Sequence, residues 1–186
     1  QDRLAEVERL AASTAESIVV GDPASEQTVL GPVANRAQFN RVQEMIATGM
    51  AEGARLVCGG PGRPASQTRG FYVRPTVFSG VHMRMRIAQE EIFGPVLCII
   101  PYETVDQAVE IANDTVYGLG GHVQSASLAS ARAVALRIRT GQVHINHPAW
   151  DPYAPFGGYK RSGNGREYGA HGLEEYLEVK SVLGFQ

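Results

Sequence analysis

The sequence predicts an α/β fold with a largely parallel sheet and helices on both of its faces. Two observations lead to this fold class. Predicted strands and helices alternate along most of the 186 residues, and the strand expected at residues 96–101 is nearly all apolar. Alternation favours parallel strands joined by crossover helices, and a continuously apolar strand is typical of a sheet covered on both faces. The chain is long enough to bury one domain core.

The first third of the chain is predicted to form two amphipathic helices and a short strand. Apolar residues recur at helical spacing over residues 4–18 and again over 39–50, and the second helix is expected to end near Gly53. A Gly-Asp-Pro sequence at 21–23 predicts a turn between the two helices. A short strand is expected directly after the second helix, at 55–58.

The middle of the chain contains a polar loop, a strand and a capped helix. Gly, Pro and Ser dominate residues 59–70, which predicts a surface loop. A strand is expected at 71–78. After the apolar strand, Thr104 and Gln107 have the spacing of a capping box and predict the start of a helix.

The alternation continues with a strand at 121–124, a helix at 127–139 and a strand at 142–146. Gly141 is expected to end that helix. Residues 147–172 are dense in Gly, Pro, aromatic and charged residues, which is typical of functional loops.

Composition and charge exclude several classes of function. A net charge of −2 with scattered arginines gives no basic surface for nucleic acid, and no apolar run approaches the roughly 20 residues of a membrane span. Cys58 and Cys98 both lie in apolar runs, so we expect buried thiols, with neither a disulfide nor a metal site. These features favour the cytoplasm.

The glycine cluster at residues 155–169 first suggests a phosphate cradle. Its spacing, G-x-G-x-x-x-G over Gly163, Gly165 and Gly169, differs from the dinucleotide-binding pattern, and no strand ends immediately before it. The sequence therefore predicts tight turns with positive φ that hold Phe156 and Glu167 in fixed positions.

Five segments follow one another along the chain: EEIFGPV, NDTVYGLGGHV, GQVHIN, PFGGYKRSGNGRE and EYLEVKSV. Their order and spacing closely resemble those of the C-terminal half of the catalytic region of the NAD(P)-dependent aldehyde dehydrogenase superfamily. The resemblance implies oxidation of an aldehyde to a carboxylic acid with NAD or NADP, through a cysteine thioester. It leaves open an acyl-CoA-forming member of the same superfamily, and an assembly module without catalysis is a further alternative.

The resemblance gives Glu91 and Phe93 a role in cofactor binding. Glu91 would accept both hydroxyls of the ribose beside nicotinamide, which suits an ionised carboxylate, and Phe93 would pack near the nicotinamide ring. The alternatives are a surface or helix-end carboxylate, for Glu91 and more so for Glu90, and plain core packing for Phe93.

Further candidates lie in the C-terminal loops. By resemblance, Glu167 belongs to a proton relay and Phe156 to the wall of the aldehyde tunnel. An ion pair of Glu167 with Arg166 or Lys160 is the alternative for Glu167, and core packing for Phe156.

Three more residues, in HPAWDPYA, would line the substrate entrance by position: Trp150, Asp151 and Tyr153. His147 is expected to be solvated rather than a general base.

The resemblance also divides the chain at its C-terminal end. Residues 1–172 would belong to the catalytic domain, and 173–186 to an oligomerisation region whose strand, Tyr176 to Phe185, pairs with a neighbouring subunit in a homodimer or homotetramer. The catalytic cysteine, asparagine and glutamate of the family would precede residue 1. We therefore expect this chain to be a fragment that is inactive alone.

Overall fold

The computed structural model describes residues 3–184, and the chain forms two compact units that are described separately, residues 1–103 and 104–186. The elements of unit 1 are α1 (Leu4–Ser17), α2 (Arg36–Ala51), β1 (Arg55–Cys58), β2 (Thr76–Ser79), α3 (Arg86–Gln89) and β3 (Val96–Cys98). Those of unit 2 are α4 (Val105–Asn113), β4 (Gly120–Val123), α5 (Leu128–Ala135), β5 (Gln142–Ile145), a 3₁₀ turn (Lys160–Ser162) and α6 (Gly169–Glu174).

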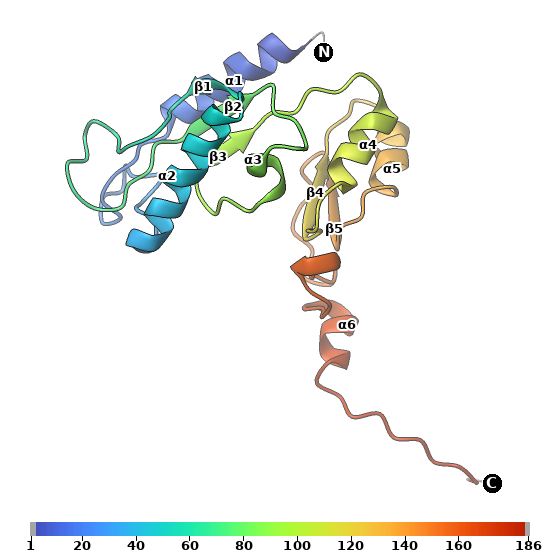
Figure 1. Ribbon diagram of the computed structural model, residues 1–186. Helices are drawn as coiled ribbons and strands as arrows, with labels where there is room; N and C mark the ends of the chain where they lie inside the picture. Colours follow the sequence, from blue (N-terminus) through green and yellow to red (C-terminus); the bar gives the residue numbers. More distant parts are fainter. Residues whose placement is uncertain (1–2, 185–186) are drawn as a thin grey trace. The chain divides into compact units, whose positions relative to one another are not determined.

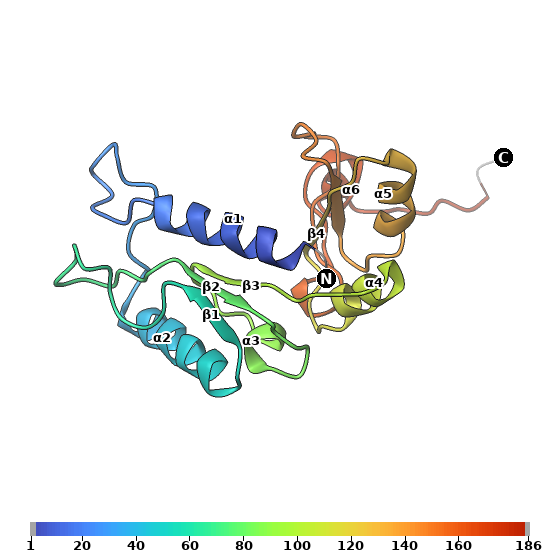
Figure 2. The same cartoon turned by 90° about the horizontal axis from the view of Figure 1, so that it is seen from above.

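Unit 1 is a three-stranded sheet between two helices. The strand order is β1-β2-β3, with β1 antiparallel and β3 parallel to β2. Figure 2 shows α1 and α2 on opposite faces of this sheet. The core lies on the α2 side, where Val42, Met45 and Ile46 pack with Phe78 of β2 and Ile87 of α3. These burials are the main stabilising contribution to unit 1.

Local sequence explains the ends of the unit 1 elements. The Asn35 side chain accepts a hydrogen bond from the Gln38 N–H at 2.9 Å and caps α2. The strand expected at 71–78 is confined to Thr76–Ser79. Pro75 immediately precedes it and has no N–H to donate, so pairing with the sheet begins at Thr76.

Unit 2 is built around the parallel pair β4 and β5, in the register that places His122 opposite His144. Helix α5 connects the two strands, and both α4 and α5 lie beside them (Figure 1). The Thr104 side chain accepts a hydrogen bond from the Gln107 N–H at 3.1 Å, which confirms the cap predicted for α4.

The α/β class is confirmed, but several details of the prediction are wrong. The strands form two separate small sheets. Strand β3 lies at a sheet edge, and Leu97 is 51% exposed, so this strand is not covered on both faces. Helix α5 ends at Ala135 rather than Arg139, because the next residues continue in tighter turns in which the Ile138 N–H bonds to the Ala135 carbonyl.

The expected C-terminal strand is not formed within the single chain. After the turn at Tyr176 that ends α6, residues 177–184 continue as an extended segment without strand pairing (Figure 1), and Phe185 lies outside the described residues. Among residues 3–184, no helix is long and apolar enough to span a bilayer, and no group of three or more metal-ligating side chains comes together.

Candidate functional site

The segment EEIFGP in unit 1 is anchored at every second residue. Glu90 is gripped by arginines, Ile92 is buried at 8% exposure, and a side-chain carbon at Gly94 would meet a methyl carbon of Val42 at 2.6 Å. A side chain at Gly94 would have to displace Val42, because the segment packs directly on α2. Glu90, Ile92 and Gly94 are thus each held by contacts with the rest of unit 1.

The two residues between the anchors point outward. Phe93 is 71% exposed and has φ 57°, and Glu91 is exposed as well. Gln38 of α2 donates from Nε2 to the Phe93 carbonyl at 2.5 Å and holds this backbone in place. Among residues 3–184, Glu91 forms neither a hydrogen bond nor an ion pair, so its carboxylate is available to an outside ligand.

Glu90 has a structural environment that differs from that of Glu91. Arg86 donates from Nε to Glu90 Oε1 at 2.7 Å, and Arg41 donates from Nη2 to Glu90 Oε2 at 2.6 Å. The hydrogen bonds from Arg86 first, and then Arg41, lower the pKa of Glu90 to about 2. Sequence reasoning did not identify Arg41, Arg86 or Gln38, since their partnership with this segment depends on the packing of α2 and α3.

Unit 2 contains an aromatic pocket of about 720 Å³ after β5. Its aromatic walls are Trp150, Phe156 and Tyr168, and His144 and Asp151 add polar groups. The structure therefore brings together three of the predicted residues, Trp150, Asp151 and Phe156. Tyr153 lies outside this pocket, with its side chain 82% exposed.

Tyr168 is the member of the aromatic pocket that sequence reasoning missed. Its ring meets Trp150 edge-on, with centroids 6.2 Å apart, and lies 6.4 Å from Phe156. Its backbone has φ 64° and ψ 159°, a region that is almost confined to glycine. Such a conformation costs about 1–3 kcal/mol in an L-residue. The signal available in the sequence was its position: Tyr168 is an aromatic residue that directly follows the predicted site residue Glu167.

Glu167 and Phe156 are joined through their backbones. Each donates its N–H to the carbonyl of the other, at 2.7 and 2.8 Å. Glu167 lines a second pocket of about 350 Å³ that Phe156 also lines, while Asp151 and Trp150 line only the first. Lys160 and Arg166 donate instead to backbone carbonyls, so the expected alternative of an ion pair with Glu167 is not found among the described residues.

The glycines of this region act mainly through close approach. A side-chain carbon at Gly141 would lie 1.6 Å from the Gly157 carbonyl oxygen, so Gly141 joins β5 to the PFGG turn rather than ending α5. Gly163 and Gly169 have the expected positive φ, and Gly165 does not. At Gly169, a side-chain carbon would also lie 2.3 Å from the Tyr153 carbonyl oxygen.

The model of the aldehyde dehydrogenase family matches residues 1–182. The chain belongs to the aldehyde dehydrogenase family. A curated relative is the 3-succinoylsemialdehyde-pyridine dehydrogenase of a Pseudomonas species, 54% identical over 184 residues, which are 99% of this chain and 39% of the relative.

Solved aldehyde dehydrogenases share the fold of this chain. A variant of aldehyde dehydrogenase C from Pseudomonas syringae, in complex with NAD+ and octanal, is 69% identical with a TM-score of 0.97, over 100% of this chain and 38% of that one. A Mycobacterium tuberculosis aldehyde dehydrogenase with NAD+ is 45% identical with a TM-score of 0.92, over 100% and 39%. The chain thus spans well under half the length of these relatives.

Neither cysteine of this aldehyde dehydrogenase chain has the environment of a nucleophile. Cys98 in β3 donates from Sγ to the Ile87 carbonyl at 3.5 Å, and burial raises the pKa of its thiol to about 11. Burial also raises the pKa of Cys58 in β1. A thiol acts as a nucleophile through its thiolate, which a raised pKa disfavours.

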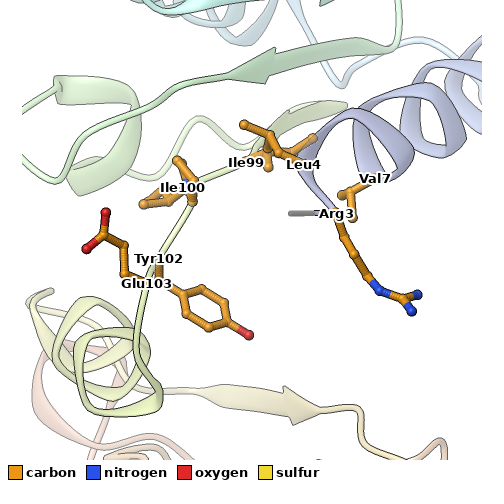
Figure 3. A pocket seen from close by; sticks show the side chains of 8 residues that line it. Arg3, Leu4, Val7, Ile99, Ile100, Tyr102 and Glu103 are labelled. Carbon is orange, nitrogen blue, oxygen red and sulfur yellow. The ribbon is translucent and has the colours of Figure 1, made fainter. Parts of the chain in front are cut away.

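A further groove of about 520 Å³ in unit 1 of this aldehyde dehydrogenase chain was not predicted. Figure 3 shows its side chains, which come from the start of α1 and from the segment after β3. Leu4, Val7, Ile99 and Ile100 make it largely apolar. None of the predicted site residues lines it.

Proposed function

We propose that this chain is part of an enzyme that oxidises an aldehyde to a carboxylic acid with NAD or NADP. The observation that carries the proposal is the anchoring of EEIFGP, which leaves Glu91 and Phe93 exposed on a fixed backbone. Unit 1 would contact the cofactor and unit 2 the aldehyde. Family membership and the NAD+ complexes of the relatives support the use of a nicotinamide cofactor.

Glu91 would bind the two hydroxyls of the ribose beside nicotinamide. A carboxylate without an internal partner can accept both protons, and charge-assisted hydrogen bonds are stronger than neutral ones. The exposed Phe93 ring would cover one face of the nicotinamide. When bound, the cofactor accepts the hydride of the reaction, so the contribution of these two residues is to hold and orient it.

The aromatic pocket of unit 2 would receive the aldehyde. Its apolar walls favour an apolar substrate, and the Pseudomonas syringae relative was solved with octanal. Phe156 would form the inner wall, with Trp150 and Asp151 nearer the entrance. We keep Tyr153 as an entrance residue that would act from outside the pocket.

Glu167 would assist proton transfer. Its backbone hydrogen bonds to Phe156 fix it beside the aromatic wall, and Glu167 is an exposed residue that lines the second pocket. A positioned carboxylate can pass on the proton that the attacking water loses.

The nucleophile is proposed to lie elsewhere in the longer protein. The environments of Cys58 and Cys98 disfavour a thiolate, whereas formation of a thioester requires one. We therefore propose that the 186 residues alone do not turn over aldehyde.

The experiment that tests the cofactor role is Glu91→Gln in the complete enzyme. We expect the KM for NAD+ or NADP+ to rise about tenfold, because one charged acceptor is lost. Steady-state absorbance of NADH at limiting cofactor measures it, with the 186-residue chain as a blank. Glu26→Gln, which removes an exposed carboxylate of unit 1 outside this segment, is the control and should leave this KM unchanged. If the kinetics of Glu91→Gln are unchanged at limiting cofactor, the assignment of Glu91 to ribose binding is wrong.

We also propose that residues 176–185 pair with another copy of the protein. Large apolar side chains are exposed along the described part of this segment: Tyr176, Leu177, Val179, Val182 and Leu183. An extended apolar segment of this kind is commonly covered by strand pairing with a partner. Removal of residues 176–186 should abolish association, as measured by light scattering. An unchanged mass would contradict the proposal.

A further inference from the structure

Tyr168 combines an unusual backbone conformation with a central place in the aromatic pocket. We infer that Tyr168 is a positioning residue that holds the Trp150 ring at the wall of this pocket and thereby sets the preference for long apolar aldehydes. The second half of this inference, the choice of aldehyde, rests on the proposed function. The first half concerns only the geometry of unit 2.

Trp150 depends on Tyr168 for its position. It lies in the loop after β5, and 75% of its surface is exposed. Its ring contact among the described residues is the edge-to-face contact with Tyr168, with an interplanar angle of 88°. An exposed loop side chain with no such contact would sample several rotamers. The Tyr168 ring is therefore the group that selects one of them.

Tyr168 itself is held from both sides. The residue before it, Glu167, is bonded to Phe156 through two backbone hydrogen bonds, and the residue after it, Gly169, abuts the Tyr153 carbonyl. Its ring also lies 6.4 Å from Phe156. The neighbours thus fix both the backbone and the ring, which is the condition under which a strained conformation persists.

The choice of residue at this position is informative. With φ 64° and ψ 159°, glycine would adopt the conformation without strain, yet the chain carries a large aromatic side chain. The Tyr168 hydroxyl forms no hydrogen bond within residues 3–184, so the ring rather than the hydroxyl carries the role. Strain retained for the sake of a side chain points to function.

The consequence for the substrate follows from contact area. Trp150, Phe156 and Tyr168 offer aromatic surface to a pocket of about 720 Å³. An eight-carbon chain can cover that surface, whereas a three-carbon aldehyde reaches little of it. Loss of a fixed Trp150 wall should therefore weaken binding of long aldehydes and leave short ones almost unaffected.

The positioning is tested on this chain by fluorescence, because Trp150 is its one tryptophan. Tyr168→Gly removes the ring and relieves the backbone, so it should fold, which circular dichroism verifies. We expect a clear drop in the time-resolved anisotropy of Trp150. Tyr168→Phe is the control and should match the wild type. If Tyr168→Gly folds and the anisotropy is unchanged, or if Tyr168→Phe lowers it equally, the positioning role is overturned.

Selectivity is tested in the complete enzyme with octanal and propanal. We expect Tyr168→Gly to lower kcat/KM for octanal about 5–10-fold through KM, with kcat retained, and to change propanal less than twofold. Tyr168→Leu provides a second variant with an apolar side chain but no ring. Equal losses for both aldehydes would overturn the role in selectivity. If the wild type oxidises neither aldehyde, the proposed function fails, while the fluorescence result still decides the positioning.

Discussion

The two units hold their exposed residues by different means. Unit 1 presents Glu91 and Phe93 by anchoring the residues next to them: Ile92 in the core and Glu90 in a double arginine clamp. Unit 2 presents its aromatic pocket through backbone contacts, where glycines permit chains to touch and Tyr168 accepts strain. Side-chain anchors can adjust when a neighbour changes, and backbone contacts cannot. The units should therefore differ in their tolerance of substitution.

The largest effect expected from this comparison is at the two close-packed glycines. Gly141→Ala would place a carbon 1.6 Å from the Gly157 carbonyl oxygen, so we expect unit 2 to lose more than about 3 kcal/mol. Gly94→Ala meets a Val42 methyl group at 2.6 Å, which can move, and should cost unit 1 about 1–2 kcal/mol. Urea unfolding measures both: Trp150 fluorescence reports on unit 2, circular dichroism reports on the whole chain, and the part of the dichroism change that Trp150 does not follow is assigned to unit 1. Similar small losses would contradict the distinction.

The next effect concerns the arginine clamp and its dependence on pH. The pKa of Glu90 is lowered to about 2 in the folded chain, from an ordinary value of 4.5. Glu90 therefore stabilises the fold above pH 4.5, and this contribution is lost as the pH falls from about 4.5 towards 2, where the folded chain also takes up the proton.

Denaturation of unit 1 at a series of pH values tests this window. Glu90→Gln should flatten part of the loss of stability between pH 4.5 and 2, because the titrating group is gone. If Glu90→Gln loses stability over this pH range as steeply as the wild type, the proposed contribution of the arginine clamp is contradicted.

The smallest effect is on reactivity rather than stability. The two cysteines both lie in strands of unit 1, and the pKa of Cys98 is raised to about 11 by burial. At pH 8 its thiolate fraction is small, so we expect it to react with Ellman's reagent about 100-fold more slowly than free cysteine. Stopped-flow absorbance before and after denaturation measures this. If Cys98 in the native chain reacts at the rate of free cysteine, its thiol is not protected by burial and this prediction is wrong.

Much of the fold could be predicted because its signals are local. The cap at Thr104, the apolar spacing of α2 and the apolar segments of β3 and β5 each depend on residues close in sequence. The strand at 71–78 was predicted too long and α5 extended too far, since propensity does not reveal where pairing or helical geometry stops. The resemblance supplied Glu91, Phe93, Phe156 and Glu167.

The sequence by itself determined the α/β class and the family, and it named the residues that we propose to contact a ligand. Tertiary structure decided which of two adjacent glutamates is clamped, that Gly141 joins two segments rather than ending a helix, and that Tyr168 stands between Trp150 and Phe156. Each of these depends on groups that approach across a packing contact. Such contacts follow from how whole elements fit together, so no local pattern encodes them.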